Sequence, residues 1–263
     1  MKRLWVLLGV GLWLSTQVLA ATATTETTGG QITGGVDIRP SVAPYGEAQF
    51  FTENTIEAGY KFNDKFSMGY VQGFYTNLHN HSKDFFYLDV GFLKASVANL
   101  YVSDDESLSL SYSTRLYTPT RVSSREAGFI TANRHYFTLS KKFSDAFTLS
   151  GSQVTVFYVY DRAGSGTSAH PLIENRFYLL GDVTLAKGLT LSLPLMFHQT
   201  RYRRYQAGAK NNDAWGLFLW TWPELLYSVT EKTAVGLSYY SDNLLEADGL
   251  AKGVAQITLQ AKL

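Results

Sequence analysis

The segment 218–224 (FLWTWPE) holds two tryptophans and a carboxylate at alternating positions, Trp220, Trp222 and Glu224. Residues two apart in a strand share one face, so these three side chains would act together. Indole rings beside a carboxylate could stack on a sugar ring or hold a cationic group. The other interpretation places the tryptophans on the outer surface of a membrane protein, in an aromatic belt at the interface. The sequence leaves both interpretations open.

The densest basic stretch is 201–205 (RYRRY), which contains Arg201, Arg203 and Arg204. Clustered guanidinium groups are suited to bidentate contacts with phosphate and carboxylate groups. The stretch follows the apolar run 189–197, so we expect it where a strand leaves a membrane on the outer side. Its functional candidates are the phosphates of lipopolysaccharide and an anionic solute entering the outer mouth. An ordinary solvated loop is the alternative.

Histidine pairs are the remaining candidates for chemistry. His79 and His81 with Asp84 are metal-ligating residue types, but we interpret them as part of a solvated polar loop. His198 and Thr200 are two apart, yet threonine is a poor substitute for a serine nucleophile. The chain has no cysteine, which excludes disulfides and thiolate chemistry. We therefore predict no enzymatic activity, no cofactor and no metal.

Composition and the first twenty residues indicate an exported protein. The net charge of +1 gives no electrostatic basis for binding nucleic acid, and 17 Tyr, 16 Phe and 5 Trp fit a sheet with rims at membrane interfaces. Residues 1–20 have a basic start, an apolar run at 4–14 and Val18-Leu19-Ala20 at the expected cleavage site, as in a signal peptide. The run is shorter than the ~20 residues of a membrane-spanning helix. We predict that 1–20 is removed and that 21–31 is a flexible periplasmic lead-in.

The end of the chain has the pattern of a strand with one apolar face. One face carries the small and apolar residues Gly253, Ala255, Ile257, Leu259, Ala261 and Leu263. The other face is mostly polar and carries Val254, Gln256, Thr258, Gln260 and Lys262. Such a terminal strand needs partners on both edges, and a barrel supplies them. These residues resemble the C-terminal assembly signal of outer-membrane β-barrels, although that signal usually ends in an aromatic residue. The resemblance implies recognition by the outer-membrane assembly machinery.

The remaining chain, 32–263, predicts about twelve strands. Alternating segments meet at tight polar turns at 63–65, 103–106, 142–145, 186–188 and 230–233, and longer connections fall at 40–47, 78–83, 118–132, 161–172, 203–213 and 243–250. Alternating short and long connections indicate an all-β fold, a transmembrane antiparallel up-and-down β-barrel in the bacterial outer membrane. Ten or fourteen strands remain as alternatives, because 85–102 is long for one strand and Gly151 interrupts the alternation. A soluble β-sandwich would use the same pattern.

If the apolar faces contact lipid, the alternate positions face the lumen. These positions carry Asp37, Arg39, Glu53, Glu57, Lys61, Asp89, Arg115, Arg134, Arg176, Asp182, Glu224, Asp242 and Lys262. If Leu219 and Leu225 face lipid, the alternating residues Trp220 and Trp222 also face the lumen and belong to this set. The mixed signs predict ion pairs that stabilise the wall, a polar path for a hydrophilic solute, or both.

Two known classes resemble the chain in part. Small monomeric channels for acidic oligosaccharides are similar in size and strand count. Their lumens carry arginine-rich tracks, whereas the predicted lumen here has charges of both signs, so we do not expect the same substrate. Outer-membrane phospholipases are similar in strand number, but the stretch 79–82 (HNHS) has their residue types at the wrong spacing. The sequence therefore predicts a narrow passive channel for small hydrophilic solutes. A plugged structural or surface-interaction barrel acting through its outer loops is the alternative, and a lipid-modifying enzyme comes third.

Overall fold

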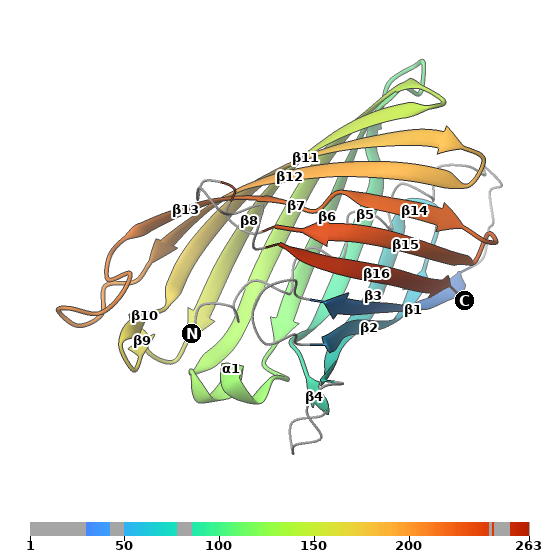
Figure 1. The fold of residues 1–263 in the computed structure, drawn as a ribbon. Coiled ribbons are helices and arrows are strands. Elements are labelled where there is room, and N and C mark those ends of the chain that lie inside the picture. Colours follow the sequence, from blue (N-terminus) through green and yellow to red (C-terminus); the bar gives the residue numbers. More distant parts are fainter. Residues whose placement is uncertain (1–29, 43–49, 78–85, 242–243, 245–252, 263) are drawn as a thin grey trace.

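The computed structural model describes residues 30–42, 50–77, 86–241, 244 and 253–262, without the side chains of 40–42, 50–53 and 77. The predicted signal peptide and most of the lead-in lie outside these residues, as do His79, His81, Asp84 and Asp242. The described chain forms a closed antiparallel barrel of twelve strands, in which each strand pairs with its neighbours in sequence (Figure 1). The predicted fold class and strand count are confirmed.

The barrel wall consists of these segments in order: β1 (Gln31–Val42), β2 (Phe50–Lys61), β3 (Phe66–Asn77), β5 (Gly91–Val102), β6 (Leu108–Thr118), β7 (Phe129–Ser144), β8 (Phe147–Tyr160), β11 (Pro171–Ala186), β12 (Leu189–Tyr202), β13 (Trp215–Thr221) with β14 (Glu224–Ser228), β15 (Thr233–Tyr240) and β16 (Val254–Lys262). The last strand closes the barrel on the first, with Leu259 opposite Ile38 and Lys262 opposite Gly35.

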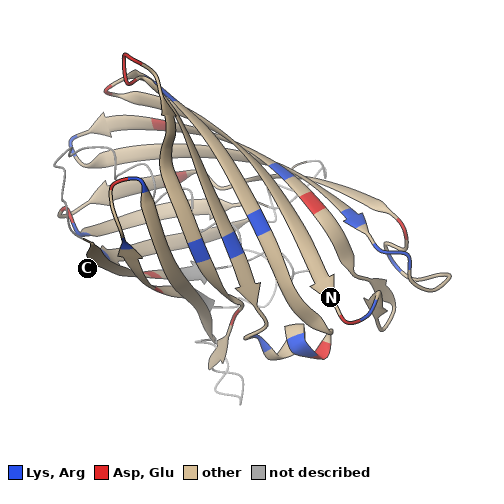
Figure 2. Ribbon diagram, turned by 180° about the vertical axis from the view of Figure 1, so that it is seen from behind, with Lys and Arg blue, Asp and Glu red and all other residues tan. Residues whose placement is uncertain are grey.

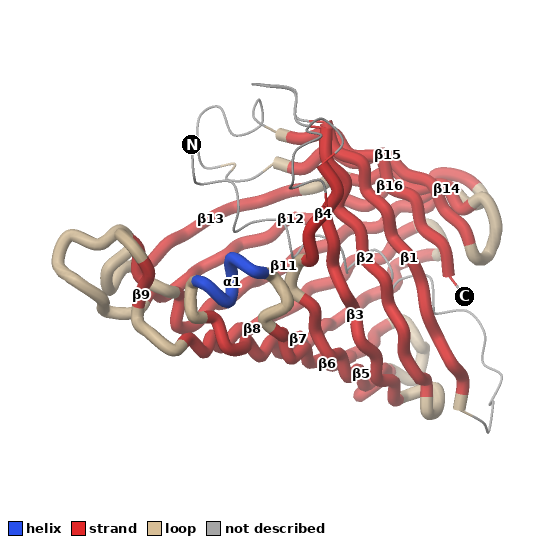
Figure 3. Tube along the Cα trace, turned by 90° about the horizontal axis from the view of Figure 1, so that it is seen from below, coloured by secondary structure: helices blue, strands red, loops and turns tan. Residues whose placement is uncertain are grey.

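The two ends of the barrel differ. The turns 62–65, 103–107, 145–146, 187–188 and 229–232 are short and lie at the end where β1 begins and β16 ends. The opposite end carries the longer connections, including the helix α1 (Val122–Glu126) and the small hairpin of β9 (Gly164–Ser165) and β10 (Ser168–Ala169) (Figure 3). Within the described ranges, no helix is long and apolar enough to cross a membrane. The predicted alternation of short and long connections is present.

Two segments that favour other strand counts in the sequence, 85–102 and the surroundings of Gly151, have local explanations. The long segment 85–102 contains a short strand, β4 (Phe86–Leu88), which pairs with β3, and then β5. A shift of register follows Val97 in β5, and Asn99 there has φ 52°. Gly151 does not interrupt β8, which stays in register with β7 on one side and β11 on the other.

The tenth wall position is one strand interrupted by proline. β13 and β14 both pair with β12, and Leu195 opposite Thr221 continues in the same register as Ser192 opposite Glu224. Pro223 separates the two segments and lacks the N–H that a ladder needs, as does Pro194 on β12. The Thr221 hydroxyl instead donates to the carbonyl of Pro194 at 2.6 Å.

The apolar side chains lie mainly on the outer surface. Leu116, Phe137, Phe177, Leu193 and Leu237 are 45%, 50%, 45%, 50% and 58% exposed. The alternate positions are buried inside and include most of the charged residues of the strands. This inversion of the pattern of a soluble protein is typical of a barrel whose outer surface contacts lipid. The arrangement is a single barrel rather than two packed sheets.

Candidate functional site

A row of basic side chains crosses adjacent strands inside the barrel. Lys94 on β5 is directly opposite Arg115 on β6, and Arg115 is opposite Arg134 on β7. The row is visible as blue positions on neighbouring strands in Figure 2. Arg115 and Arg134 are 3% and 7% exposed. Direct cross-strand neighbours have Cβ atoms only about 5 Å apart, so like charges in this register repel one another unless something stabilises them.

Aromatic rings hold these guanidinium groups. The Cζ atom of Arg115 lies 4.4 Å from the ring centroid of Tyr136 and 5.0 Å from that of Phe92. The Cζ atom of Arg134 lies 4.4 Å from the ring centroid of Tyr117. A cation over an aromatic face is stabilised by the ring quadrupole, more strongly when both are desolvated. From β2, on the far side of β3, Glu57 approaches Lys94 with 3.9 Å between carboxylate oxygen and ammonium nitrogen.

A second charged group lies on the next strands, β8 and β11. Glu174 is 4% exposed and makes a short charged contact with Arg176 two residues along the same strand. The other carboxylate oxygen accepts a hydrogen bond from the Tyr158 hydroxyl at 2.8 Å. Arg176 also donates to the Tyr178 hydroxyl at 3.3 Å. The row of Lys94, Arg115 and Arg134 contains only cationic side chains. Glu174 therefore supplies a buried negative charge to this basic part of the interior.

A third charged group joins the two edges where the chain closes. Asp37 accepts two hydrogen bonds from Arg39, at 3.2 and 3.3 Å. Arg39 also approaches Glu224 on β14, with 3.8 Å between nitrogen and oxygen. Glu224 accepts a hydrogen bond from Thr258 at 2.6 Å, and Gln260 donates to Asp37 at 3.2 Å. All of these side chains are buried, so the group is a hydrogen-bonded network rather than a set of exposed charges.

Both tryptophans of 218–224 lie inside the barrel. Trp220 and Trp222 are 2% and 7% exposed, and Glu224 is 3% exposed. On the other face, Leu217 and Leu225 are 60% and 40% exposed. These two indoles therefore do not lie in an outer aromatic belt at the membrane interface, which was the alternative interpretation. Trp222 packs edge-on against Tyr178, with 6.1 Å between ring centroids.

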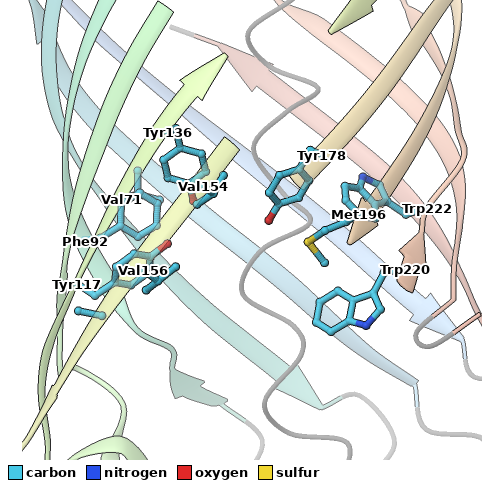
Figure 4. Packing of buried hydrophobic residues seen from close by; sticks show 11 residues of the cluster. Val71, Phe92, Tyr117, Tyr136, Val154, Val156, Tyr178, Met196, Trp220 and Trp222 are labelled. Carbon is cyan, nitrogen blue, oxygen red and sulfur yellow. The ribbon is translucent and has the colours of Figure 1, made fainter. Parts of the chain in front are cut away.

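The interior also carries an apolar surface that the sequence analysis missed. Val71, Val154, Val156, Met196 and the aromatic residues form one buried cluster that extends over several neighbouring strands. Figure 4 shows Tyr136 on one side of the interior, with Tyr178, Met196, Trp220 and Trp222 on the other. The signal was present in β8, where Ser150, Ser152, Val154 and Val156 share the inward face.

The remaining residues of the predicted interior set have varied positions. Asp182 is 7% exposed and accepts a hydrogen bond from Ser192 at 2.5 Å. Lys61 pairs with Asp64 at the short-turn end, and Asp89 approaches Arg121 at 3.5 Å near the opposite end. Lys262 is half-buried at the end of β16, whereas the side chain of Glu53 is outside the described set. Lys94 and Glu174 were omitted from the prediction, although each shares its face with residues in it.

The basic stretch 201–205 does not form a single patch of guanidinium groups. Arg201 pairs with Asp213, and its Cζ atom lies 5.5 Å from the ring centroid of the exposed Trp215. Arg203 donates to the backbone carbonyl of Tyr158 at 3.0 Å. Arg204 is exposed. Two of the three arginines are thus engaged in contacts within the wall and its loops.

The histidine on β12 does not complete a catalytic relay. Both Thr200 and Glu174 approach the same ring nitrogen of His198, Nε2, at 2.6 and 3.1 Å. A relay needs the carboxylate on one ring nitrogen and the hydroxyl on the other. The side chains of His198 and Thr200 are also buried inside the barrel, away from its outer surface. Among the described residues, no group of three or more potential metal ligands is assembled.

No protein-family model and no curated protein matches this sequence. Solved structures do resemble it. The KdgM porin has a TM-score of 0.54 at 9% identity, covering 86% of this chain and 98% of that porin. The KdgM porin in complex with disordered oligogalacturonate has a TM-score of 0.54 at 10% identity, with the same coverage. The NanC porin has a TM-score of 0.56 at 9% identity, covering 89% of this chain and all of that porin, 100%. At such identities the likeness concerns the fold alone, and this chain shares the β-barrel fold of these porins.

Proposed function

We propose that this protein is an outer-membrane channel through which small hydrophilic solutes diffuse passively. The observation that carries the proposal is the distribution of charge across the wall. Strand residues with apolar side chains face outward, whereas Arg39, Arg115, Arg134, Arg176 and Glu224 are buried inside. Charged groups inside a membrane-spanning barrel are costly to maintain, and they are typical of walls that contact water or a solute.

The net charge also differs between parts of the interior, although Arg39 lies with Asp37 and Glu224, and Glu57 lies near Lys94. The row of Lys94, Arg115 and Arg134 occupies β5 to β7, whereas Asp37 and Glu224 lie on β1 and β14, on the far side of the barrel in strand order. Such a separation sets up a field across the interior that orients a charged or dipolar solute. The porin-like fold supports the outer membrane as the location, reached through the predicted signal peptide.

Planar-bilayer recording of the folded full-length barrel tests this proposal. We expect discrete conductance steps that persist in Trp215→Leu, whose indole is 56% exposed on the outer surface. We expect Arg134→Gln and Arg115→Gln to change the reversal potential in a salt gradient. Absence of conductance from protein that is correctly folded, as judged by heat modifiability on gels, would exclude the channel.

A second candidate is a plugged barrel that acts through its outer loops. It is favoured by the buried ion pairs inside and by the way the loops join to each other. Residues 163–170 and 203–210 are linked by backbone hydrogen bonds, among them Arg203 to His170 at 2.8 Å and Lys210 to Thr167 at 2.8 Å. This ordered outer structure, with the exposed Arg204, would be the surface for lipopolysaccharide or another partner. The bilayer recording separates the two candidates.

A further inference from the structure

Three of the outer connections are joined to one another by backbone hydrogen bonds. They are 119–128, which contains α1, 161–170, which contains the β9–β10 hairpin, and 203–214 (Figure 3). Asp161 donates to the carbonyl of Gly128 at 2.8 Å, which links the first connection to the second. Arg203 donates to the carbonyl of His170 at 2.8 Å, which links the second to the third. The three connections therefore form one assembly, which we call the outer collar.

The imidazole of His170 lies where the three connections meet. It is 8% exposed and stacks on the ring of Tyr160 at the end of β8, with 4.1 Å between the centroids and 10° between the planes. The backbone N–H of His170 donates to the carbonyl of Ala163 at 2.9 Å, and the ring interacts with the backbone of Ala127. Its Nε2 atom is buried and has no hydrogen-bond partner among the described residues. A protonated imidazole carries an N–H at both ring nitrogens, so protonation would bury a donor that has no acceptor.

The charged groups around the ring also disfavour a proton on it. Arg162, from the same connection, and Arg203, from the connection 203–214, both repel an imidazolium at this position. Asp161 attracts it, but two hydrogen bonds from Arg162, at 2.7 and 3.2 Å, already engage this carboxylate. On the remaining side the ring meets the neutral phenol of Tyr160. Burial, together with the two guanidinium groups, lowers the pKa of His170 below its ordinary value.

We propose that His170 is a pH-sensitive latch, which holds the outer collar together while its imidazole is neutral and releases it on protonation. A base whose pKa is lower in the joined state binds fewer protons there than in the released state. The joined collar is therefore stable above the ordinary histidine pKa of about 6.5, and it loses stability as the pH falls below that value. The inference concerns the outer end alone and does not depend on whether the barrel conducts.

Hydrogen exchange of the folded full-length protein in detergent micelles, at pH ~7.5 and pH ~5.5, tests the latch. Exchange times are scaled to the intrinsic amide rate at each pH, so that only the change in protection is compared. With a pKa of about 6.5 in the released state, proton linkage allows a loss of protection of up to about 10-fold at the lower pH. We expect a several-fold loss, up to this limit, at the amides of Asp161, His170 and Arg203. The amides of the β7–β8 hairpin should show no comparable loss.

Variants assign the effect to this histidine. His170→Phe keeps a flat ring on Tyr160 but cannot take up a proton, so the protection of the collar should be the same at both pH values. Arg162→Gln removes one repelling charge and frees Asp161 to pair with the imidazolium, so the loss of protection on acidification should become smaller. His135→Phe is the matched control, since it removes a histidine of β7 in the barrel wall and should leave the pH response of the collar intact.

Each outcome supports or overturns the latch. Equal protection of the unchanged protein at both pH values overturns it, and so does a loss of protection that persists in folded His170→Phe. Loss of the response in His135→Phe also overturns it, because the pH sensor would then lie in the wall. If His170→Phe itself opens the collar, NMR titration of the His170 ring in the unchanged protein decides. A midpoint below the ordinary value of about 6.5 supports the latch, and a midpoint at or above that value overturns it.

Discussion

Arg39, on the first strand, lies 3.8 Å from Glu224, although β16 and β15 separate their strands in the wall. The pair therefore connects the first strand to the last part of the chain across the interior of the closed barrel. Asp37 holds the same guanidinium at shorter distances, 3.2 and 3.3 Å. The two carboxylates thus share one cation, and they share it unequally.

This inequality predicts the order of three neutral substitutions. Asp37→Asn should reduce the free energy of unfolding by roughly 3 kcal/mol, because it removes the closer partner of a buried guanidinium. Glu224→Gln should cost only about 1 kcal/mol, since Arg39 keeps Asp37. Asp182→Asn is the control: among the described residues Asp182 forms no ion pair, and asparagine keeps an acceptor for Ser192, so we expect little change. Denaturant unfolding in detergent or vesicles measures all three, and equal effects would contradict the unequal sharing.

The closing strand should tolerate no charge on its outer face. Leu259 is 42% exposed between Ile38 and Val235, at the seam where β16 joins β1 and β15. We expect Leu259→Asp to cost on the order of 2 kcal/mol in the membrane and to remove the heat-modifiable folded band on unboiled gels. Leu259→Ile should leave the band intact. A normal band in the aspartate variant would mean that this face does not meet lipid.

Quenching by brominated lipid should separate the tryptophans of the barrel. Trp215 is 56% exposed on the outer surface, whereas Trp220 and Trp222 are 2% and 7% exposed. In single-tryptophan variants we expect strong quenching of Trp215 and little quenching of the other two. Acrylamide, which is soluble in water, tests whether the interior pair can be reached from the aqueous phase. Strong lipid quenching of Trp220 would mean that this face of β13 points toward lipid and not toward the interior.

Neutralising the arginines of 201–205 should give three different results. Arg204→Gln should shift the reversal potential toward cations at ~0.1 M salt and lose that effect at ~1 M, where screening shortens from about 10 to 3 Å. Arg203→Gln should loosen the outer loops, because its contact with the Tyr158 carbonyl is lost. Limited proteolysis checks that effect. Arg201→Gln should do little to selectivity, since Asp213 already pairs with that charge.

One short turn should respond to pH. In the turn between β5 and β6, the hydroxyls of Ser103 and Ser107 donate to Asp105 at 2.5 and 2.6 Å, and they lower the pKa of its carboxyl. A lowered pKa stabilises the folded turn above the ordinary range for aspartate, and this stabilisation is lost as the pH falls through the folded value. NMR titration should find Asp105 ionised below pH ~3.9, the value for a free aspartate, and Ser103→Ala with Ser107→Ala should raise its pKa.

The fold could be predicted because lipid and water impose a strict period of two. Leu191, Leu193 and Leu195, for example, alternate with Ser192 and Pro194 along β12. The same period placed Trp220 and Trp222 in the predicted interior set. It could not reveal which inward residues meet, because partners such as Arg39 and Glu224 depend on closure of the whole ring. Nor did it reveal the apolar interior, since the valines of β8 are inward at positions where the pattern led us to expect polar groups.

The interruption between β13 and β14 has a consequence for motion. Pro223 and the nearby Pro194 lack backbone N–H groups, so fewer ladder hydrogen bonds join β12 to this part of the wall, while the register is the same on both sides. On the other edge, Tyr239 still donates to the carbonyl of Pro223 at 3.0 Å. Local opening of a native protein begins where backbone protection is lowest, so amide exchange should be fastest at this seam among the strands of the wall. Because the residues on each side remain in step, the strand can separate and re-form without slipping. We therefore expect the wall beside Trp222 to open and close locally while the rest of the barrel stays paired.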